Sequence, residues 1–201
     1  LEKMTTLVMT GVTALVRATA NAMEQNGILY PAQYISDTLA SADITHISNE
    51  IPFAENCPVP DPNQDDVVFC SDPDYIELLR AVGVDIIELT GNHFQDYGDA
   101  ATLLTLDMYD EEGWPYYGGG RDLDDAKEPA IMENHGNSLS FLGCNPVGPY
   151  WAWATDEQPG CLACDWDYMK QETHTLAETV DVPIVTFQYW EFYHYEPTAE
   201  Q

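Results

Sequence analysis

Apolar residues follow two spacings along the first half of the chain, and the change between them predicts strands that alternate with helices. Short apolar runs at residues 5–10, 42–48 and 84–93 have the length of strands and end in glycine or polar residues. The intervening segments repeat their apolar positions at helical spacing, at residues 12–27, 32–42, 72–83 and 99–112. This alternation is typical of an α/β fold in which helices flank a sheet.

The second half of the chain predicts a hairpin followed by one more helix and strand. Two apolar runs, residues 129–134 and 138–145, are joined by His135, Gly136 and Asn137, a plausible hairpin turn. Helical spacing returns at residues 168–179, and residues 180–192 form a last apolar strand. The segments 114–126 and 146–166 are turn-rich or irregular. We find no repeat or linker, so residues 1–201 are expected to form a single domain.

The charge of the chain narrows the classes of partner. It has 35 Asp and Glu against 6 Lys and Arg, a formal net charge of −29. This excludes a nucleic-acid binder that neutralises phosphates, and it opposes attraction to other polyanions. Such self-repulsion is tolerated best in salty or divalent-rich surroundings, which favours an extracellular or halophilic setting over ordinary solubilising acidity. No apolar run reaches the length of about 18 residues that a membrane-spanning helix needs, and LEKMTT does not begin like a signal peptide.

Five cysteines predict disulfides with one thiol left over. Cys57 and Cys70 bracket a loop rich in Pro, Asn and Asp, which a disulfide would staple. Cys161 and Cys164 form a C-x-x-C, but no second ligand pair for zinc and no thioredoxin-like setting accompany it. We therefore expect two disulfides and a buried, unpaired Cys144, in an oxidising compartment.

Polar side chains follow three of the predicted strands. They are Asn49 and Glu50, Asn92 and His93, and Gln188 and Glu191. Ligands of open α/β sheets bind where strands end, and imidazole, amide and carboxylate groups suit zinc, manganese or iron. Each residue taken alone is more simply a cap or a turn residue. Three such groups in register predict a site, because the ends of parallel strands meet at one edge of a sheet.

Residues 78–98, LLRAVGVDIIELTGNHFQDYG, resemble the signature of the bacterial capsule-synthesis CapA family, also called the poly-γ-glutamate capsule biosynthesis family. The family pattern is a strand that ends in Asn-His, then two residues, then Asp-Tyr-Gly, as in Asn92, His93 and residues 96–98 here. The family's fold is similar to that of the calcineurin-like metallophosphatases. The resemblance therefore implies an α/β fold with metallophosphatase-like sheet layers flanked by helices.

Three further blocks resemble the family in the same order. One is an Asp-containing strand ending in Glu-x-Pro, with Asp43, Glu50 and Pro52 in matching places. The next is the glycine turn, Ala-x-x-Pro and hairpin of residues 114–145, and the last is the strand at residues 180–201. Four ordered blocks are more specific than any single motif.

The chain also departs from the family pattern. Gly11 is followed by Val12, where the family has an Asp that ligates metal in the related phosphatases. Gln188 or Tyr189 stands where a His is expected, which leaves Glu191 as the nearest retained acid. The family's Gly-x-His-x-His segment would follow residue 201. The resemblance thus implies a domain that lacks its C-terminal segment and an incomplete two-metal site, with an exposed sheet edge that favours a homo-oligomer.

The resemblance implies a CapA-type role in the synthesis, export or anchoring of a cell-surface anionic polymer such as poly-γ-glutamate. If the protein is catalytic, it implies metal-assisted hydrolysis with a divalent ion (Mn, Zn or Fe). The expected ligands are Glu50, Asn92 and His93, with Asp96 orienting His93 and Glu191 as a further ligand or base. The expected substrate contacts are Asn49, Arg17, Gln188 and Tyr189. Two alternatives remain, a non-catalytic binding or scaffold module and a secreted metal-dependent phosphoesterase acting on small phosphate esters.

An aromatic stretch lies in the irregular segment. It comprises Tyr150, Trp151, Trp153, Trp166 and Tyr168. These rings either stack on a sugar or polymer or cover the core, and we expect the core role because aromatic side chains bury large apolar areas.

Overall fold

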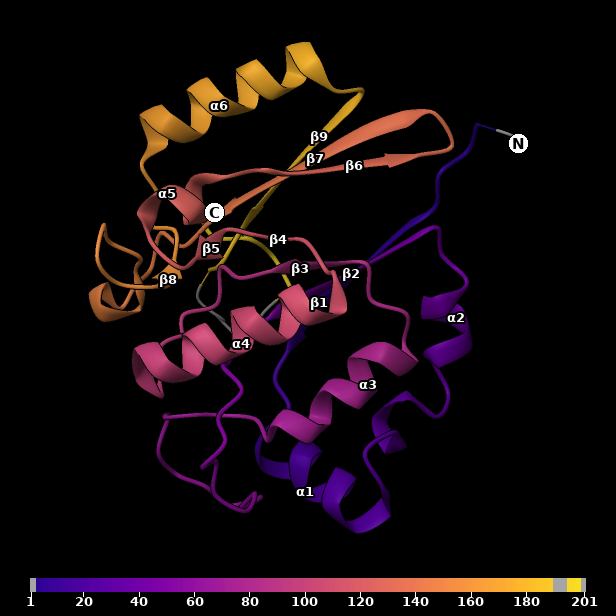
Figure 1. Cartoon of the computed structure of the whole chain (residues 1–201), viewed down its shortest axis with the longest axis vertical. Helices are drawn as coiled ribbons and strands as arrows, with labels where there is room; N and C mark the ends of the chain where they lie inside the picture. The colour runs from indigo at the N-terminus through magenta and orange to yellow at the C-terminus, as the bar shows by residue number, and fades with distance from the viewer. Residues whose placement is uncertain (1–2, 190–194, 200–201) are drawn as a thin grey trace.

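Two β-sheets lie one above the other, and helices cover their outer faces (Figure 1). The computed structural model describes residues 3–189 and 195–199. Helix α6 (Trp166–Thr179) lies over one sheet, and α4 (Gly98–Glu112), α3 (Ile76–Ala81) and α1 (Arg17–Asn26) lie on the side of the other. None of the described helices is both long enough and apolar enough to cross a membrane.

The first sheet contains four parallel strands in the order of the chain. They are β1 (Leu7–Thr13), β2 (Ile44–Asn49), β3 (Ile86–Glu88) and β4 (Tyr116–Tyr117). Every residue of β2 and β3 is buried, as expected for central parallel strands covered on both faces. The crossovers also contain α2 (Ser36–Ala40) and two short 3-10 helices, η1 (Tyr30–Ala32) and η2 (Pro73–Tyr75).

The second sheet contains the hairpin β6 (Ala130–Asn134) and β7 (Asn137–Cys144), with β9 (Val182–Phe187) parallel to β7. His135 and Gly136 form the turn of the hairpin, both with positive φ, 52° and 82°. The smaller elements are β5 (Gly119–Gly120), which pairs with β8 (Gly160–Cys161), α5 (Leu123–Lys127) and η3 (Tyr150–Ala152).

Three apolar clusters join these layers. Ile44 and Ile86 of the first sheet pack with Leu139 and Phe141 of the second. A larger cluster packs the first sheet against α1, α3 and α4, and a third packs β7 and β9 against α5 and α6. The core therefore follows the sequence pattern, because each strand and helix buries its apolar positions against a neighbouring layer.

The expected α/β architecture and the β6–β7 hairpin are confirmed, but several boundaries differ. The strand predicted at residues 84–93 is ordered as a strand only at β3, and the chain then turns toward α4. The helix predicted from residue 12 begins at Arg17, because Val12 and Thr13 still pair with β2. Segments expected to be irregular contain β4, β5, β8 and α5, whose strands pair with residues distant in sequence and so leave little local pattern.

The disulfide between Cys57 and Cys70 is confirmed, whereas the prediction of an unpaired Cys144 is wrong. Cys144 pairs with Cys164, and Cys161 is the buried free thiol. The register explains this, because a bridge between Asn145 and Ala163 places Cys144 and Cys164 beside each other with their Cα atoms 5.1 Å apart. Cys161 lies in β8 and its Sγ contacts the carbonyl oxygen of Ala152 at 3.1 Å.

Removal of the Cys57–Cys70 disulfide is expected to destabilise the fold substantially. The two cysteines are 13 residues apart, and closing a loop of this size in the unfolded chain stabilises a domain by about 3 kcal/mol. The double variant Cys57→Ala/Cys70→Ala should lose that amount of unfolding free energy in urea titrations under oxidising conditions. Cys161→Ala, which leaves both disulfides in place, is the control for loss of a cysteine. Equal stability of wild type and double variant would contradict the prediction.

Candidate functional site

The ends of β2, β3 and β9 bring three predicted site residues together. Glu50 follows β2, Asn92 lies four residues beyond β3, and Gln188 follows β9. The Gln188 Nε2 donates to Glu50 Oε1 at 3.0 Å and to Asn92 Oδ1 at 2.9 Å. Its backbone N–H donates to the carbonyl oxygen of Cys144, so β7 fixes the position of this residue. One side-chain amide thus joins residues that are 138 and 96 positions away in sequence.

Gly91 allows the first two of these segments to meet. A Cβ atom at this position would lie 2.5 Å from the Cα of Glu50 and 2.8 Å from its carbonyl oxygen. Gly91 is not among the residues with positive φ, so the reason for glycine here is the close approach of two backbones and not the tight turn that the sequence Gly-Asn-His would predict.

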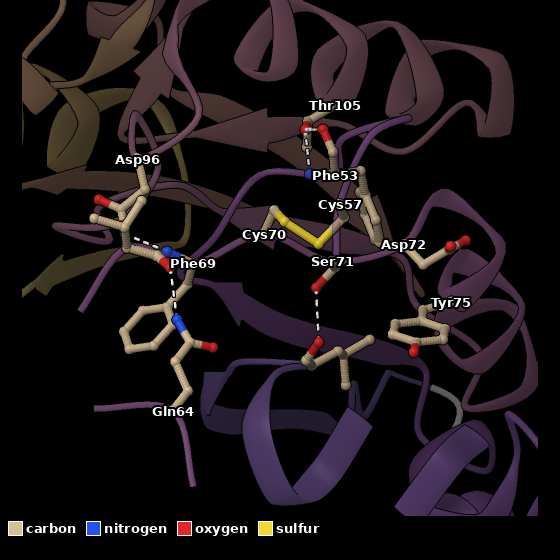
Figure 2. The surroundings of a disulfide bond; sticks show 12 residues. Phe53, Cys57, Gln64, Phe69, Cys70, Ser71, Asp72, Tyr75, Asp96 and Thr105 are labelled. Atoms are coloured by element: carbon tan, nitrogen blue, oxygen red, sulfur yellow. Dashed lines mark hydrogen bonds between the residues drawn. A yellow bond between two sulfur atoms is a disulfide. The ribbon is translucent and has the colours of Figure 1, made fainter. Parts of the chain in front are cut away.

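His93 and Asp96 form a hydrogen-bonded pair beside this cluster. His93 Nδ1 lies 2.7 Å from Asp96 Oδ2, the contact that the sequence analysis expects. The same oxygen accepts the backbone N–H of Phe69 at 2.8 Å, and Figure 2 shows Asp96 turned toward Phe69. The Phe69 ring packs edge-on against the His93 ring, with centroids 4.8 Å apart. Asp96 thereby fixes both the orientation of the imidazole and its tautomer, because a carboxylate accepts the proton on Nδ1.

Burial and local charge shift the acid–base properties of this group of residues. Burial raises the pKa of Glu50 above its ordinary value, although the charge of His93 and the hydrogen bond from Gln188 act in the opposite direction. Burial lowers the pKa of His93, but its hydrogen bond with Asp96 and the charges of Asp96 and Glu50 outweigh burial, so this pKa lies above its ordinary value. The two residues therefore stabilise opposite charges on each other.

No group of three or more His, Cys, Asp or Glu side chains lies close enough to hold an ion within residues 3–189 and 195–199. The amide of Gln188 donates to the oxygens of Glu50 and Asn92 that would otherwise be ligands. Val12, at the position of the family's metal-binding Asp, supplies no ligand. Glu191, the further ligand or base expected from sequence, lies outside the described residues.

Three other residues are predicted to contact substrate, namely Asn49, Tyr189 and Arg17. The side chain of Asn49 is buried and donates to the carbonyl oxygen of Ile51 at 2.8 Å, so it holds the turn after β2. Tyr189 directly follows Gln188 and is partly buried. Arg17 is the first residue of α1, and its guanidinium lies over the Phe69 ring, 4.6 Å from the centroid.

Phe69 is a site residue that the sequence analysis misses. It touches Arg17, His93 and Asp96, and it is held by the neighbouring Cys70 disulfide (Figure 2). The one feature of the sequence that points to Phe69 is its position beside Cys70, at the end of the loop that the predicted disulfide closes.

The expectation that the aromatic stretch covers the core is wrong for three of its five rings. Tyr150, Trp151 and Trp166 are 76%, 54% and 51% exposed. Tyr150 packs edge-on against Trp151, and Trp166 packs on Phe187, the residue before Gln188. Tyr150 and Trp151 lie in η3 and Trp166 is the first residue of α6, and all three rings pack on a neighbouring ring at the surface instead of entering the core.

A solved structure resembles this fold. The crystal structure of a phosphatase from Mycoplasma pneumoniae, described as novel, superposes with a TM-score of 0.50 over 91% of this chain and 54% of that chain. At 14% identity the likeness concerns the fold alone, and it confirms the predicted metallophosphatase-like arrangement of sheets and helices.

Sequence comparisons identify the family. The capsule biosynthesis protein CapA of Bacillus anthracis is 24% identical over 208 residues, in an alignment that covers 100% of this chain and 50% of CapA. The chain thus spans about half the length of this relative. Residues 6–201 match the family described as bacterial capsule synthesis protein PGA_cap. Because that match covers all but the first five residues of the sequence, the chain belongs to this capsule synthesis family.

Proposed function

We propose that this protein acts in the synthesis, export or anchoring of poly-γ-glutamate at the cell surface, and that its site binds the polymer without cleaving it. Membership of the capsule synthesis family supports the process. The observation that carries the binding role is the amide of Gln188, which donates to both Glu50 and Asn92. The side chains of Gln188, Asn92 and Glu50 offer hydrogen-bond donors and acceptors suited to the amide links of such a polymer. Because the net charge of −29 opposes attraction to a polyanion, recognition in this proposal rests on such local contacts and not on overall charge.

An exported setting is part of this proposal. Two disulfides support it, because disulfides persist in oxidising compartments and are rare in the cytosol. The acidic surface supports it further, because screening by salt outside the cell weakens the repulsion between carboxylates.

Polymer binding tests the proposal directly. In equilibrium binding with poly-γ-glutamate, Gln188→Ala should weaken affinity about tenfold, since it leaves Glu50 and Asn92 without their shared donor. Gln171→Ala on the exposed face of α6 is the matched control and should bind like wild type. A wild-type protein that does not bind the polymer, or a Gln188→Ala variant with unchanged affinity, would overturn the binding role.

A metal-dependent hydrolase acting on the polymer or on a small phosphate ester is the second candidate. The pair of His93 and Asp96 favours it, because histidines that ligate metals commonly bind a carboxylate through their second nitrogen. Glu50, Asn92 and His93 would hold the ion, a divalent Mn, Zn or Fe, and Glu191 would have to complete the set.

Metal analysis separates the two candidates. If the site only binds polymer, we expect less than about 0.1 equivalent of Mn²⁺ or Zn²⁺ in the purified protein. Titration with either metal should show no saturable binding, whereas a specific metal site would bind its ion tightly enough to saturate. His93→Ala should behave the same way. One equivalent of metal in wild type that His93→Ala loses would instead establish the hydrolase candidate as the better one.

A further inference from the structure

A cavity of about 420 Å³ lies between the start of α1 and the loop closed by the Cys57–Cys70 disulfide. Arg17, Gln64 and Tyr97 are among the residues that line it. Figure 2 shows this loop, with Gln64 and Phe69 on the side of Asp96. The cavity therefore adjoins the His93–Asp96 pair but is formed by other segments of the chain.

Arg17 is held in this cavity in an unusual state. Its φ is 49°, a left-handed conformation that costs a non-glycine residue about 1 kcal/mol or more. Its Nε is buried and has no hydrogen-bond partner in the described part of the chain, while one terminal nitrogen donates to the carbonyl oxygen of Asp66 at 2.9 Å. Buried donors of this kind are normally paired, so the unmet Nε indicates a missing acceptor.

Arg17 also differs from Arg80 and Arg121 in its ion pairing. Arg80 and Arg121 each contact two carboxylates, whereas Arg17 makes no ion pair with a described residue. This is notable in a chain with 35 acidic residues and only 6 Lys and Arg. Its terminal nitrogens and Nε form a fork that matches a carboxylate, which accepts two parallel hydrogen bonds.

Phe69 connects this arginine to the polar cluster. The centroid of the Phe69 ring lies 4.6 Å from the guanidinium carbon of Arg17 and 4.8 Å from the centroid of the His93 ring. A chain of repeating units that occupied the cluster of Glu50, Asn92 and Gln188 would pass His93 and reach Arg17.

We infer that Arg17 and its cavity bind one carboxylate of a γ-linked glutamyl chain whose neighbouring unit occupies the Gln188 cluster. This inference rests on the proposed polymer-binding function and adds to it the group that is recognised. It also gives the unpaired Nε an acceptor and the guanidinium an ion-pair partner.

The surroundings favour a carboxylate over a phosphate. Four acidic residues also line the cavity, namely Glu24, Asp61, Asp66 and Asp72. One guanidinium can compensate one negative charge of a ligand, so the second charge of a phosphate dianion would face these carboxylates without a cationic partner. Two of the four carboxylates already accept hydrogen bonds, Glu24 from Tyr75 and Asp66 from Gln64.

Calorimetric titration with γ-linked triglutamate tests the inference. Arg17→Gln should lose at least about tenfold in affinity at about 0.15 M salt, and Arg17→Lys should recover only part of it because an ammonium lacks the fork. Arg121→Gln, which removes an arginine distant in the chain from this cavity, should bind like wild type. The triglutamate tetramethyl ester, which lacks all four carboxylate charges, should bind wild type as weakly as triglutamate binds Arg17→Gln. Inorganic phosphate should compete poorly.

Different failures have different meanings. If Arg17→Gln binds triglutamate as tightly as wild type while Gln188→Ala does not, the Arg17 subsite is wrong and the polymer-binding function stands. If wild type binds neither triglutamate nor the polymer, both proposals fall. Effective competition by phosphate would overturn the preference for a carboxylate. Thermal melts of Arg17→Gln and Arg17→Lys show whether each variant is folded, and a folded Arg17→Lys keeps the test valid if Arg17→Gln unfolds.

Discussion

The single substitution Gln188→Glu is expected to create a divalent-metal site at the cluster of Glu50, Asn92 and His93. It replaces an amide that donates to Glu50 at 3.0 Å and to Asn92 at 2.9 Å with a group that only accepts. Two carboxylates at this separation repel each other, so one of them takes up a proton unless a cation lies between them. With Glu50, Asn92 and His93 nearby, the new carboxylate completes a set of oxygen and nitrogen ligands suited to Mn²⁺ or Zn²⁺.

The expected signature is a dependence of stability on metal. Without metal, Gln188→Glu should unfold more easily than wild type by about 1–3 kcal/mol, the cost of a buried acceptor that loses its donor. Saturating metal, at about a hundred times its dissociation constant, should return about 2.7 kcal/mol to the variant and little to wild type. Thermal melts with added Mn²⁺, Zn²⁺ or the chelator EDTA measure both effects.

Two controls isolate the cause. Gln188→Ala removes the same amide without adding a carboxylate ligand, so its melting temperature should respond to metal much less than that of Gln188→Glu. Adding His93→Ala to Gln188→Glu removes a nitrogen ligand and should abolish most of the metal response. A Gln188→Glu variant whose melts are identical with metal and with EDTA would show that the side chains cannot converge on an ion.

This prediction bears on the relation between the chain and the metallophosphatase-like fold. The fold places Glu50, Asn92 and His93 at the ends of strands, where a metal site of that kind would be built. The side-chain amide of Gln188 donates hydrogen bonds to oxygens of two of these three candidate ligands, Glu50 and Asn92. A gain of metal binding by one substitution would show that the fold retains the geometry and that residue 188 decides its use.

The sequence predicts the location of the site better than its internal contacts. Asn92 follows β3 of the first sheet and Gln188 follows β9 of the second sheet, both strands that the apolar pattern identifies. The rule that parallel strands end at one edge of a sheet accounts for Glu50 and Asn92, whereas the contact with Gln188 depends on how the two sheets pack. The pair of His93 and Asp96 is also predictable, because the two residues are three positions apart in one turn. That Gln188 donates to two partners depends on side-chain orientation, which no spacing in the sequence encodes.

Contacts between distant loops could not be predicted for the same reason. The disulfide between Cys144 and Cys164 depends on the bridge of Asn145 with Ala163, a pairing of irregular segments without periodicity. The contact of Phe69 with His93 depends on the conformation of the loop closed by the Cys57–Cys70 disulfide. Local patterns identify elements in the sequence, but the register between them is fixed only by packing of the whole chain.

Gly91→Ala is expected to be the most damaging conservative change near the site. The added Cβ would lie 2.5 Å from the Cα of Glu50 and 2.8 Å from its carbonyl oxygen, and both are backbone atoms that cannot rotate away. The segment after β2 must shift, and since overpacking of this kind typically costs about 1–3 kcal/mol, a clash between backbones should reach at least the upper value. The shift also carries Glu50 away from Gln188, so polymer affinity should fall together with stability.

Gly11→Ala is the matched control for this prediction. Gly11 lies in β1 at the end of the same sheet, has no positive φ, and a Cβ there would meet nothing within 4 Å. It should retain wild-type stability within about 0.5 kcal/mol, as surface substitutions do. Urea unfolding of both variants decides the matter. If Gly91→Ala is as stable as Gly11→Ala and binds the polymer like wild type, then close packing of Gly91 against Glu50 does not position the site, and the convergence of these strand ends needs another cause.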